Sequence, residues 1–220
     1  MKVLDLFSGR EGFSAPWVKN GYTVVTVDNN IDGNFNPTHN MDIKKFDPVK
    51  LGYEEGYFDV ILAGVPCTEY ARWGMRGVNK HLKNKDLTPN NDLLKEFIRI
   101  KDVLKPKFWM VENVKASVKF ISKYLGRPSI KIGMRWFWTN KPNIQMFYDK
   151  DDWKLINLAY IPKTVTVKRL VKGKMVTCGR GRRGLAKSLS TIEFVISEAL
   201  MCFLLNDRST WTKRKVERVK

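Results

Sequence analysis

Residues 3–14 read Val-Leu-Asp-Leu-Phe-Ser-Gly-Arg-Glu-Gly-Phe-Ser, and this stretch decides the fold. The apolar run over 3–7 predicts a short buried strand, and a helical stretch follows to about Asn20. Gly9 and Gly12 lie between the two and let a ligand approach the backbone, where a helix N-terminus favours polar or anionic groups. The same glycines also suit an ordinary turn. The stretch therefore indicates the start of an α/β domain and leaves open whether its turn binds a ligand.

Strand and helix signals alternate through the first 140 residues. Apolar or β-branched runs predict strands, and apolar residues spaced by three and four predict a helix. The predicted strands cover 22–27, 58–65, 108–111 and 135–138, and the clearest predicted helix covers 92–104. Such an alternation favours βαβ units in a mostly parallel sheet, whose functional groups gather at the carboxyl ends of the strands.

Three chemically capable side chains follow predicted strands at that edge. Asp28 either accepts hydrogen bonds from the ribose hydroxyls of a nucleotide-type cofactor or merely caps its strand in water. Pro66 stiffens the backbone before Cys67, so we expect an exposed thiol with a reactive thiolate; the alternative is an inert small hydrophobe. Glu112 follows an apolar run, where partial burial would raise its pKa and let it donate a proton, unless backbone amides satisfy the carboxylate.

The composition excludes several classes of protein. The chain has 220 residues, is 43% hydrophobic and has 40 Lys+Arg against 22 Asp+Glu, a net charge of +18. Its longest apolar stretch, 194–205, contains Ser197 and Glu198 and is too short to span a bilayer, and we expect no secretory signal. Three cysteines predict a reducing compartment, and two histidines leave little material for a metal site. The charge predicts a polyanionic partner, nucleic acid before a membrane surface.

The positive charge is densest in the last third of the chain. Residues 151–220 have a net charge of +10, and the segment 163–187 holds nine Lys and Arg with no acidic residue. Within it, strands over 164–171 and 174–178 are predicted to form a hairpin. A capping box then begins an apolar helix over about 190–205.

Five blocks of sequence resemble those of the DNA cytosine-5 methyltransferases, in particular the short phage-type members. They come in the family's order over about residues 3–140, and the Pro-Cys and Glu-Asn-Val pair is the most specific part. The blocks are Asp5-Leu6-Phe7-Ser8-Gly9 with Gly12, Asp28, Pro66-Cys67-Thr68-Glu69-Tyr70, Lys105-Pro106-Lys107-Phe108-Trp109 leading to Glu112-Asn113-Val114, and Phe137-Trp138-Thr139-Asn140. The resemblance implies a Rossmann-like S-adenosylmethionine-dependent methyltransferase fold with a very small basic recognition region.

The resemblance also implies a cofactor, a mechanism and no metal. S-adenosylmethionine would lie over the glycine turn, with its ribose on Asp28 and its adenine near Asp42. A cytosine would be flipped out of double-stranded DNA, Cys67 would attack its C6 and Glu112 would act at N3, with Arg135 as a further catalytic residue. The implied cofactor-binding residues are Asp5, Phe7, Ser8, Gly9, Gly12, Asp28, Asn29, Asp42 and Pro66.

DNA binding is implied for two segments. Residues 69–85 would form a loop that closes on DNA, and the basic hairpin with the arginines after it would form a reduced element that reads little sequence. The implied nucleic-acid-binding residues are Arg72, Arg76, Lys168, Arg169, Lys172, Arg180, Arg182 and Arg183. We therefore expect a catalytic domain over 1–140, a recognition region over 141–189, and a C-terminal helix over 190–220 that packs back on the catalytic domain and ends in a basic tail.

The sequence departs from the family's pattern at several positions. Glu11 stands where the family usually has a glycine, Val65 replaces the first proline of Pro-Pro-Cys, and the Gln-x-Arg-x-Arg block is reduced to Arg135. Two alternatives to DNA cytosine-5 methylation therefore stay open: the same chemistry on RNA, and a catalytically silent nucleic-acid-binding relative. We expect a cytoplasmic enzyme, acting in the host cytoplasm if its source is a virus.

Overall fold

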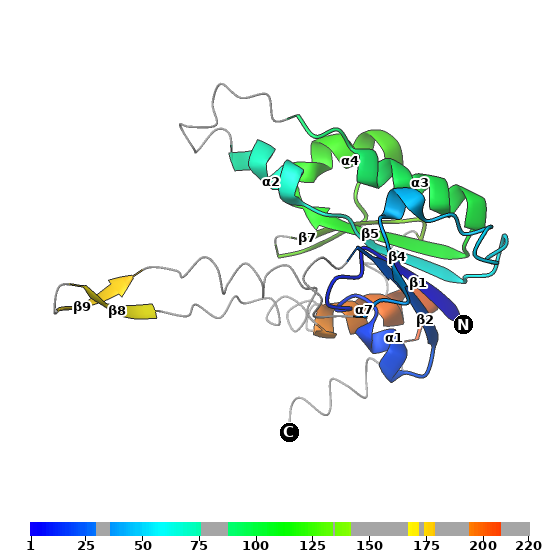
Figure 1. Ribbon diagram of the computed structural model, residues 1–220, viewed down its shortest axis with the longest axis horizontal. Coiled ribbons are helices and arrows are strands. Elements are labelled where there is room, and N and C mark those ends of the chain that lie inside the picture. The colour runs from blue at the N-terminus through cyan, green and yellow to red at the C-terminus, as the bar shows by residue number, and fades with distance from the viewer. Residues whose placement is uncertain are drawn as a thin grey trace.

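A sheet of seven strands, in the order β3-β2-β1-β4-β5-β7-β6, forms the centre of the computed structural model (Figure 1). The structure describes residues 1–29, 36–75, 88–133, 135–141, 167–171, 174–178 and 194–207. The strands of the large sheet are β1 (Lys2–Leu6), β2 (Thr23–Asp28), β3 (His39–Asn40), β4 (Val60–Gly64), β5 (Phe108–Val114), β6 (Ile130–Ile132) and β7 (Arg135–Thr139).

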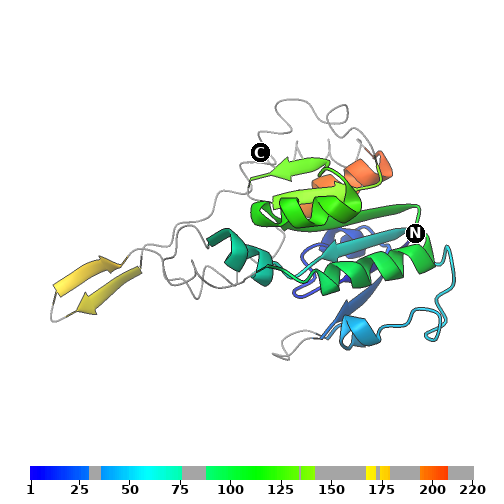
Figure 2. The same ribbon diagram turned by 90° about the horizontal axis from the view of Figure 1, so that it is seen from above.

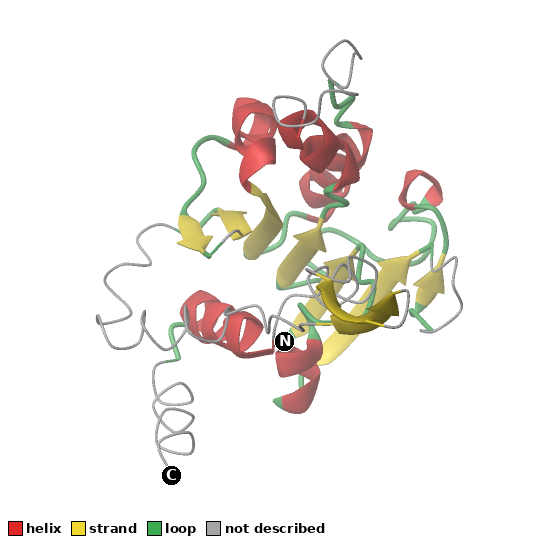
Figure 3. Cartoon of the chain, turned by 90° about the vertical axis from the view of Figure 1, so that its left-hand side faces the viewer, coloured by secondary structure: helices red, strands yellow, loops and turns green. Residues whose placement is uncertain are grey.

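Helices cover both faces of this sheet, as Figures 1 and 3 show. One face carries α2 (Thr68–Met75), α3 (Asp92–Leu104) and α4 (Val118–Leu125), and seen from above α3 and α4 cover neighbouring parts of it (Figure 2). The other face carries α1 (Ala15–Lys19) and α7 (Phe194–Leu205). Two short 3-10 helices, η1 (Ile43–Lys45) and η3 (Lys115–Ser117), lie beside the sheet.

Alternate residues of each central strand belong to two different cores, because successive side chains of a strand point to opposite faces. Val3 of β1 packs in the core under α1 and α7, whereas its neighbour Leu4 packs in the core under α3 and α4. Val60 and Ile61 of β4 divide in the same way. Burial on both faces explains why these strands read as continuous apolar runs.

The first five strands in sheet order are parallel, and the last two are not. β1 pairs in parallel with β2 and β4, and β4 pairs in parallel with β5. β7 is antiparallel to β5, and β6 is antiparallel to β7. The expectation of an α/β fold with a mostly parallel sheet is therefore confirmed, and the antiparallel pair at one edge refines it.

The observed elements differ from the predicted ones mainly near β5. The predicted helix over 92–104 is α3, with the same bounds. β5 extends to Val114, three residues beyond the predicted end, because its polar residues continue the ladder with β7. Glu112 therefore lies within the strand. α4 and β6 are further elements that the sequence did not predict, and the first part of the predicted loop over 69–85 is the helix α2, while residues 76–85 lie outside the described part of the chain.

The C-terminal helix α7 packs against the same core as α1. Its apolar residues from Ile196 to Leu204 are buried with Val3 and Trp17, and the Ser197 hydroxyl donates a hydrogen bond to the Phe13 carbonyl oxygen. In the residues described, no helix is both long and apolar enough to cross a bilayer. Burial in this core therefore accounts for the apolar character of α7.

Two more strands, β8 (Val167–Val171) and β9 (Lys174–Cys178), form a separate antiparallel sheet. The predicted hairpin is confirmed, with a first strand that starts three residues later than predicted. The turn residue Lys172 and the capping box before α7 lie outside the described residues.

Candidate active site

The glycine turn after β1 is held against the end of β2. The Gly9 N–H donates a hydrogen bond of 2.9 Å to Asp28 Oδ2, and the Ser8 N–H donates one of 3.2 Å to the Val27 carbonyl oxygen. Gly9 has a φ of 49° and Glu11 one of 57°, both in the left-handed region that favours glycine. The glycine that the family usually has at the position of Glu11 thus fits the backbone better than the residue present.

Two buried polar side chains lie under this turn without a hydrogen-bond partner. Asp5 is fully buried at the centre of the sheet, and neither of its carboxyl oxygens has a partner among the described residues. Burial raises the pKa of Asp5 to about 7; the nearby Ser14 side chain acts in the opposite direction, and the charges of Glu11 and Asp28 add to the rise. The Ser8 hydroxyl is buried and unpaired as well. Unsatisfied groups of this kind call for an explanation, and a ligand with a cationic or hydrogen-bond-donating group would supply one.

An open pocket of about 140 Å³ adjoins the turn. It is formed where β1, β2 and β4 end and where α3 begins, which is the edge at which open α/β sheets bind ligands. Its lining includes the apolar side chains of Phe7, Ile43 and Leu93 and the polar side chains of Asp28, Asn29 and Asp42. Apolar walls with a few carboxylates suit a nucleoside, whose flat base is apolar and whose ribose donates hydrogen bonds.

The predicted cofactor residues gather here to different degrees. Phe7, Asp28, Asn29, Asp42 and Pro66 line the pocket. As described above, Asp5, Ser8 and Gly9 lie in or beneath the adjoining turn. Gly12 belongs to the same turn and is not among the lining residues. Asp42 has a second contact, because its Oδ1 accepts a hydrogen bond of 3.0 Å from the Lys44 N–H and caps η1.

Cys67 lies at the start of α2, one residue after Pro66. Its carbonyl oxygen accepts a hydrogen bond of 2.8 Å from the Ala71 N–H, which fixes it to the first turn of the helix. The side chain is half-buried, and burial raises the pKa of the thiol, with the charge of Glu112 acting in the same direction and that of Arg135 against it. The thiol is therefore half-buried where the sequence predicted an exposed one, and the raised pKa disfavours the predicted thiolate.

Glu112 forms a buried ion pair with Arg135. The Arg135 Nη1 donates a hydrogen bond of 2.9 Å to Glu112 Oε1. The register of β5 and β7 makes the pair possible: Glu112 lies opposite Phe137, and Arg135, two residues from Phe137, lies on the same face. Burial raises the pKa of Glu112, as expected, and the positive charge of Arg135 opposes this shift.

Asn113 connects this strand to the Pro-Cys segment. Its Nδ2 donates a hydrogen bond of 2.9 Å to the Val65 carbonyl oxygen, and Asn113 is fully buried. The contact joins the backbone at Val65, two residues before Cys67, to the side chain of Asn113, which directly follows Glu112. The thiol and the carboxyl group are thereby fixed at one edge of the sheet, next to the pocket that Pro66 lines.

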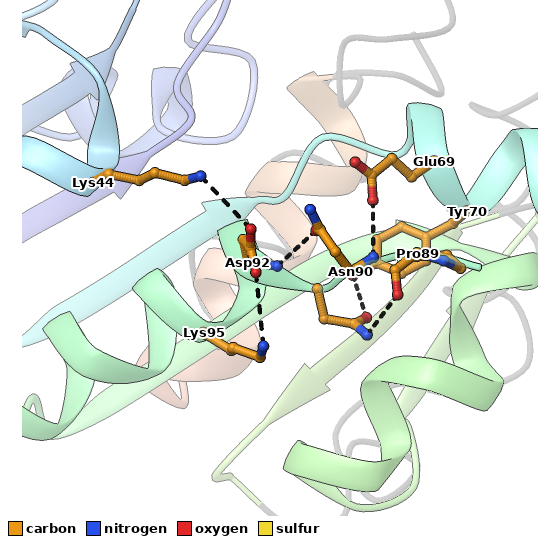
Figure 4. Close-up of polar contacts among 8 residues, drawn as sticks. Lys44, Glu69, Tyr70, Pro89, Asn90, Asp92 and Lys95 are labelled. Atoms are coloured by element: carbon orange, nitrogen blue, oxygen red, sulfur yellow. Dashed lines mark hydrogen bonds and ion pairs between the residues drawn. The ribbon is translucent and has the colours of Figure 1, made fainter. Parts of the chain in front are cut away.

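A second polar network joins α2 to the start of α3 (Figure 4). The Tyr70 hydroxyl donates a hydrogen bond of 3.0 Å to Asn91 Oδ1, and the Asn90 N–H donates one of 3.2 Å to Glu69 Oε2. Asn91 has a φ of 60°, and the Asp92 N–H donates to Asn90 Oδ1 at the helix start. The sequence reading missed this network, although Asn-Asn-Asp before an apolar period is a helix-start signal. It holds α2, and so Cys67, against the rest of the domain.

The predicted nucleic-acid-binding residues are only partly described. Arg72 is exposed on α2 and lines a pocket beside the network of Figure 4. Lys168 and Arg169 lie on β8. The remaining residues lie outside the described part of the chain: Arg76, Lys172, Arg180, Arg182 and Arg183. Across the described ranges, no group of His, Cys, Asp and Glu has an arrangement that could hold a metal ion.

Comparison with known proteins points to one family. A family model for the C-5 cytosine-specific DNA methylases matches residues 1–125. The Type II methyltransferase M.FnuDI of Fusobacterium nucleatum is 32% identical over 120 residues, which are 52% of this chain and 33% of that protein. M.HgiGI of Herpetosiphon aurantiacus is 28% identical over 122 residues, 52% of this chain and 90% of that protein.

Other relatives are matched over a limited share of their length. The chain spans about a third of M.FnuDI and 28% of M.DdeI of Desulfomicrobium norvegicum, with 30% identity to the latter over 52% of this chain. Among solved structures, the Entamoeba histolytica methyltransferase EhMeth superposes with a TM-score of 0.42 and 15% identity, covering 68% of this chain and 60% of that one.

Proposed function

The chain belongs to the C-5 cytosine-specific DNA methylase family, and from this premise we propose that it transfers a methyl group from S-adenosylmethionine to C5 of a cytosine in DNA. The observation that supports the proposal best is the placement of Cys67 beside the buried Glu112–Arg135 pair, at the edge of the sheet where the pocket lined by Phe7, Asp28 and Pro66 opens. A thiol, a carboxylic acid and a pocket for a methyl donor are what the reaction requires.

The residues present fit S-adenosylmethionine. Its bound form supplies an electrophilic methyl group on a sulfonium centre. Asp28 and Asn29 would accept hydrogen bonds from the ribose, while Phe7 and Ile43 would contact the adenine ring. The carboxyl group of Asp5, buried and without a partner, would face the cationic amino group and explain an otherwise costly burial.

Cys67 would supply the nucleophile that activates the cytosine. With the base flipped out of the duplex, the sulfur forms a bond to C6, and the electron pair of the C5–C6 double bond shifts toward C5. Because the pKa of the thiol is raised, the sulfur attacks from the neutral thiol, and its proton must pass to water during or before the attack. After methylation, loss of the C5 proton restores the double bond and expels the Cys67 sulfur.

Glu112 would protonate or donate a hydrogen bond to N3 of the base, which withdraws electrons from the ring as Cys67 attacks. Burial raises the pKa of the carboxyl group, which favours its protonated, hydrogen-donating form against the opposing charge of Arg135. Arg135 would fix the orientation of Glu112 through the 2.9 Å hydrogen bond between their side chains.

Trapping with a DNA duplex that contains 5-fluorocytosine tests the proposal. Fluorine at C5 blocks the final elimination, so the wild-type chain should form a covalent adduct that depends on S-adenosylmethionine. Cys67→Ser should abolish the adduct, whereas Cys202→Ala, which removes a buried thiol on α7, should leave it intact. Wild-type protein that binds the duplex without forming an adduct would support the catalytically silent alternative, and an adduct on RNA alone would favour the RNA alternative.

The same proposal includes four further parts. These are a double-stranded DNA partner, base flipping, a weak sequence preference of the basic region, and a viral or microbial cytoplasmic setting. They are supported by family membership and by the basic composition of 163–187. Bisulfite sequencing of DNA methylated in vitro checks the sequence preference: we expect a short or loose consensus, and a long strict one would refute that expectation.

A further inference from the structure

Two groups of cations in the described residues differ in whether they form ion pairs with acidic residues. On the side of α3, each of several lysines and one arginine forms an ion pair with an acidic residue. The pairs include Lys44–Asp92, Lys95–Asp92, Arg99–Glu96 and Lys105–Glu55. These cations are neutralised locally and contribute little field beyond the surface.

The exposed cations around η3, α4 and β6 have no such partners. From residue 113 to residue 148 the sequence contains seven Lys and Arg and no acidic residue. Lys115, Lys119 and Lys131 are exposed, and none of the three forms an ion pair with any residue that the structure describes. Among the residues that the structure describes, the charge of these three lysines is therefore not compensated by an acidic partner.

These three lysines lie at the edge of the sheet that holds the candidate active site. Lys115 directly follows β5, which contains Glu112. Lys131 of β6 lies opposite Trp136 of β7, and Trp136 lies opposite Asn113 of β5. Lys131 is therefore level with the end of β5. We name Lys115, Lys119 and Lys131 the basic edge.

Aromatic rings hold two of these cations in place. The Lys119 Nζ lies 5.3 Å from the centre of the Trp73 ring on α2, and the Lys131 Nζ lies 5.4 Å from that of Trp136. Trp73 also packs edge-on against Phe120 of α4, with 4.9 Å between the ring centres. Since Cys67 begins α2, the Trp73 contact places Lys119 beside the helix that carries the thiol.

We propose that the basic edge is a DNA-binding surface that contacts the phosphates flanking the target cytosine. The inference rests on the proposed function and adds a third DNA contact to the two that the sequence predicted, in residues 69–85 and in the basic hairpin. A duplex whose target base reaches Cys67 and Glu112 must place its backbone along this edge of the sheet. Lysines without acidic partners would neutralise that backbone, release its counterions, and position the duplex without reading its sequence.

Salt dependence of DNA binding tests the proposal. The variant Lys115→Gln/Lys119→Gln/Lys131→Gln is compared with the wild-type full chain by fluorescence anisotropy of a labelled duplex over a salt series. Each lost phosphate contact lowers the slope of log K against log salt concentration by about 0.9, so the triple variant should lose roughly 2 to 3 from its slope. The matched control is Lys44→Gln/Lys95→Gln/Lys105→Gln, which removes the same net charge from ion-paired positions. Its slope should change by less than about 1.

The outcomes separate this inference from the proposed function. Equal slopes for the basic-edge variant and the control would overturn the inference, as would a wild-type chain that does not bind the duplex. Methyl transfer is measured in parallel at saturating DNA. A wild-type chain that binds with the expected slopes and transfers no methyl group would refute the proposed function and leave the basic edge supported. Thermal unfolding of each variant confirms that the exposed substitutions leave the fold intact.

Discussion

Replacing Asp5 with asparagine should stabilise the ligand-free protein at alkaline pH and not at acidic pH. In the folded chain, burial raises the pKa of Asp5 from 3.8 to about 7. The unfolded chain ionises this group above pH 3.8, whereas the folded chain keeps the proton until about pH 7. The free-energy penalty of burying this carboxyl group in its ionised form is therefore absent below pH 3.8, grows between pH 3.8 and pH 7, and is constant above pH 7.

The size of the penalty follows from the shift. A shift of one pKa unit corresponds to about 1.4 kcal/mol, so a pKa raised from 3.8 to about 7 costs roughly 4 kcal/mol of folding stability above pH 7. Asn has nearly the same shape and no charge, so Asp5→Asn removes this pH-dependent cost. The constant cost of burying an amide, about 1–3 kcal/mol, applies at every pH and does not change the slope.

Urea unfolding, followed by circular dichroism at a series of pH values without cofactor, measures the effect. The difference in free energy of unfolding between Asp5→Asn and wild type should rise by up to about 4 kcal/mol from pH 4 to pH 8. Asp102→Asn on α3 removes the same charge from an exposed position and separates burial from net charge. A difference that is the same at both pH values would refute the reasoning. The variant should also bind S-adenosylmethionine more weakly, because it lacks the carboxylate proposed to face the amino group.

Three further variants test other parts of the site. Glu112→Gln should slow methyl transfer by about 10²-fold or more with DNA affinity nearly unchanged, because the amide is not an acid; unchanged turnover in a single-turnover assay would contradict its role. Glu11→Gly should raise the free energy of unfolding by about 1 kcal/mol, because a φ of 57° is strained for a residue with a Cβ; a loss of stability in urea would contradict this. Tyr70→Phe should lower stability by about 1 kcal/mol through the lost hydrogen bond to Asn91, and a melting temperature equal to that of wild type would show that the bond contributes nothing.

Local patterns in the sequence predicted the central strands and α3. The features that these patterns did not predict depend mainly on pairing between strands that are distant in sequence. The apolar period of α3 and the apolar run of β4 are signals contained within one element. The extension of β5 to Val114 depends on its partner β7, which lies more than twenty residues away and pairs in the opposite direction. α4 had a signal that was not used, since Val118, Ile121 and Leu125 follow a helical spacing.

The same distinction applies to the candidate site. Motif order identified Cys67 and Glu112, because each follows a recognisable strand. The Glu112–Arg135 ion pair could not be predicted, since it requires the register of an antiparallel ladder. The environment of the Cys67 thiol could not be predicted for a related reason: the charges that act on its pKa, those of Glu112 and Arg135, come from strands distant in sequence.

The contact between Lys141 and α7 has a consequence for how the chain can be altered. Lys141 is the last described residue before 142–166, and its Nζ donates hydrogen bonds of 2.6 Å and 2.8 Å to the carbonyl oxygens of Phe203 and Leu204. The contact therefore fastens the chain just after β7 to the C-terminal end of α7, whereas the intervening segment enters α7 at its other end, Phe194. Since doubling the length of a loop costs only about 0.6 kcal/mol in closure entropy, we expect changes in the length of the chain between β7 and α7 to cost little stability as long as Lys141 is kept. The packing of α7 against α1 would then be retained, because it depends on residues outside that segment.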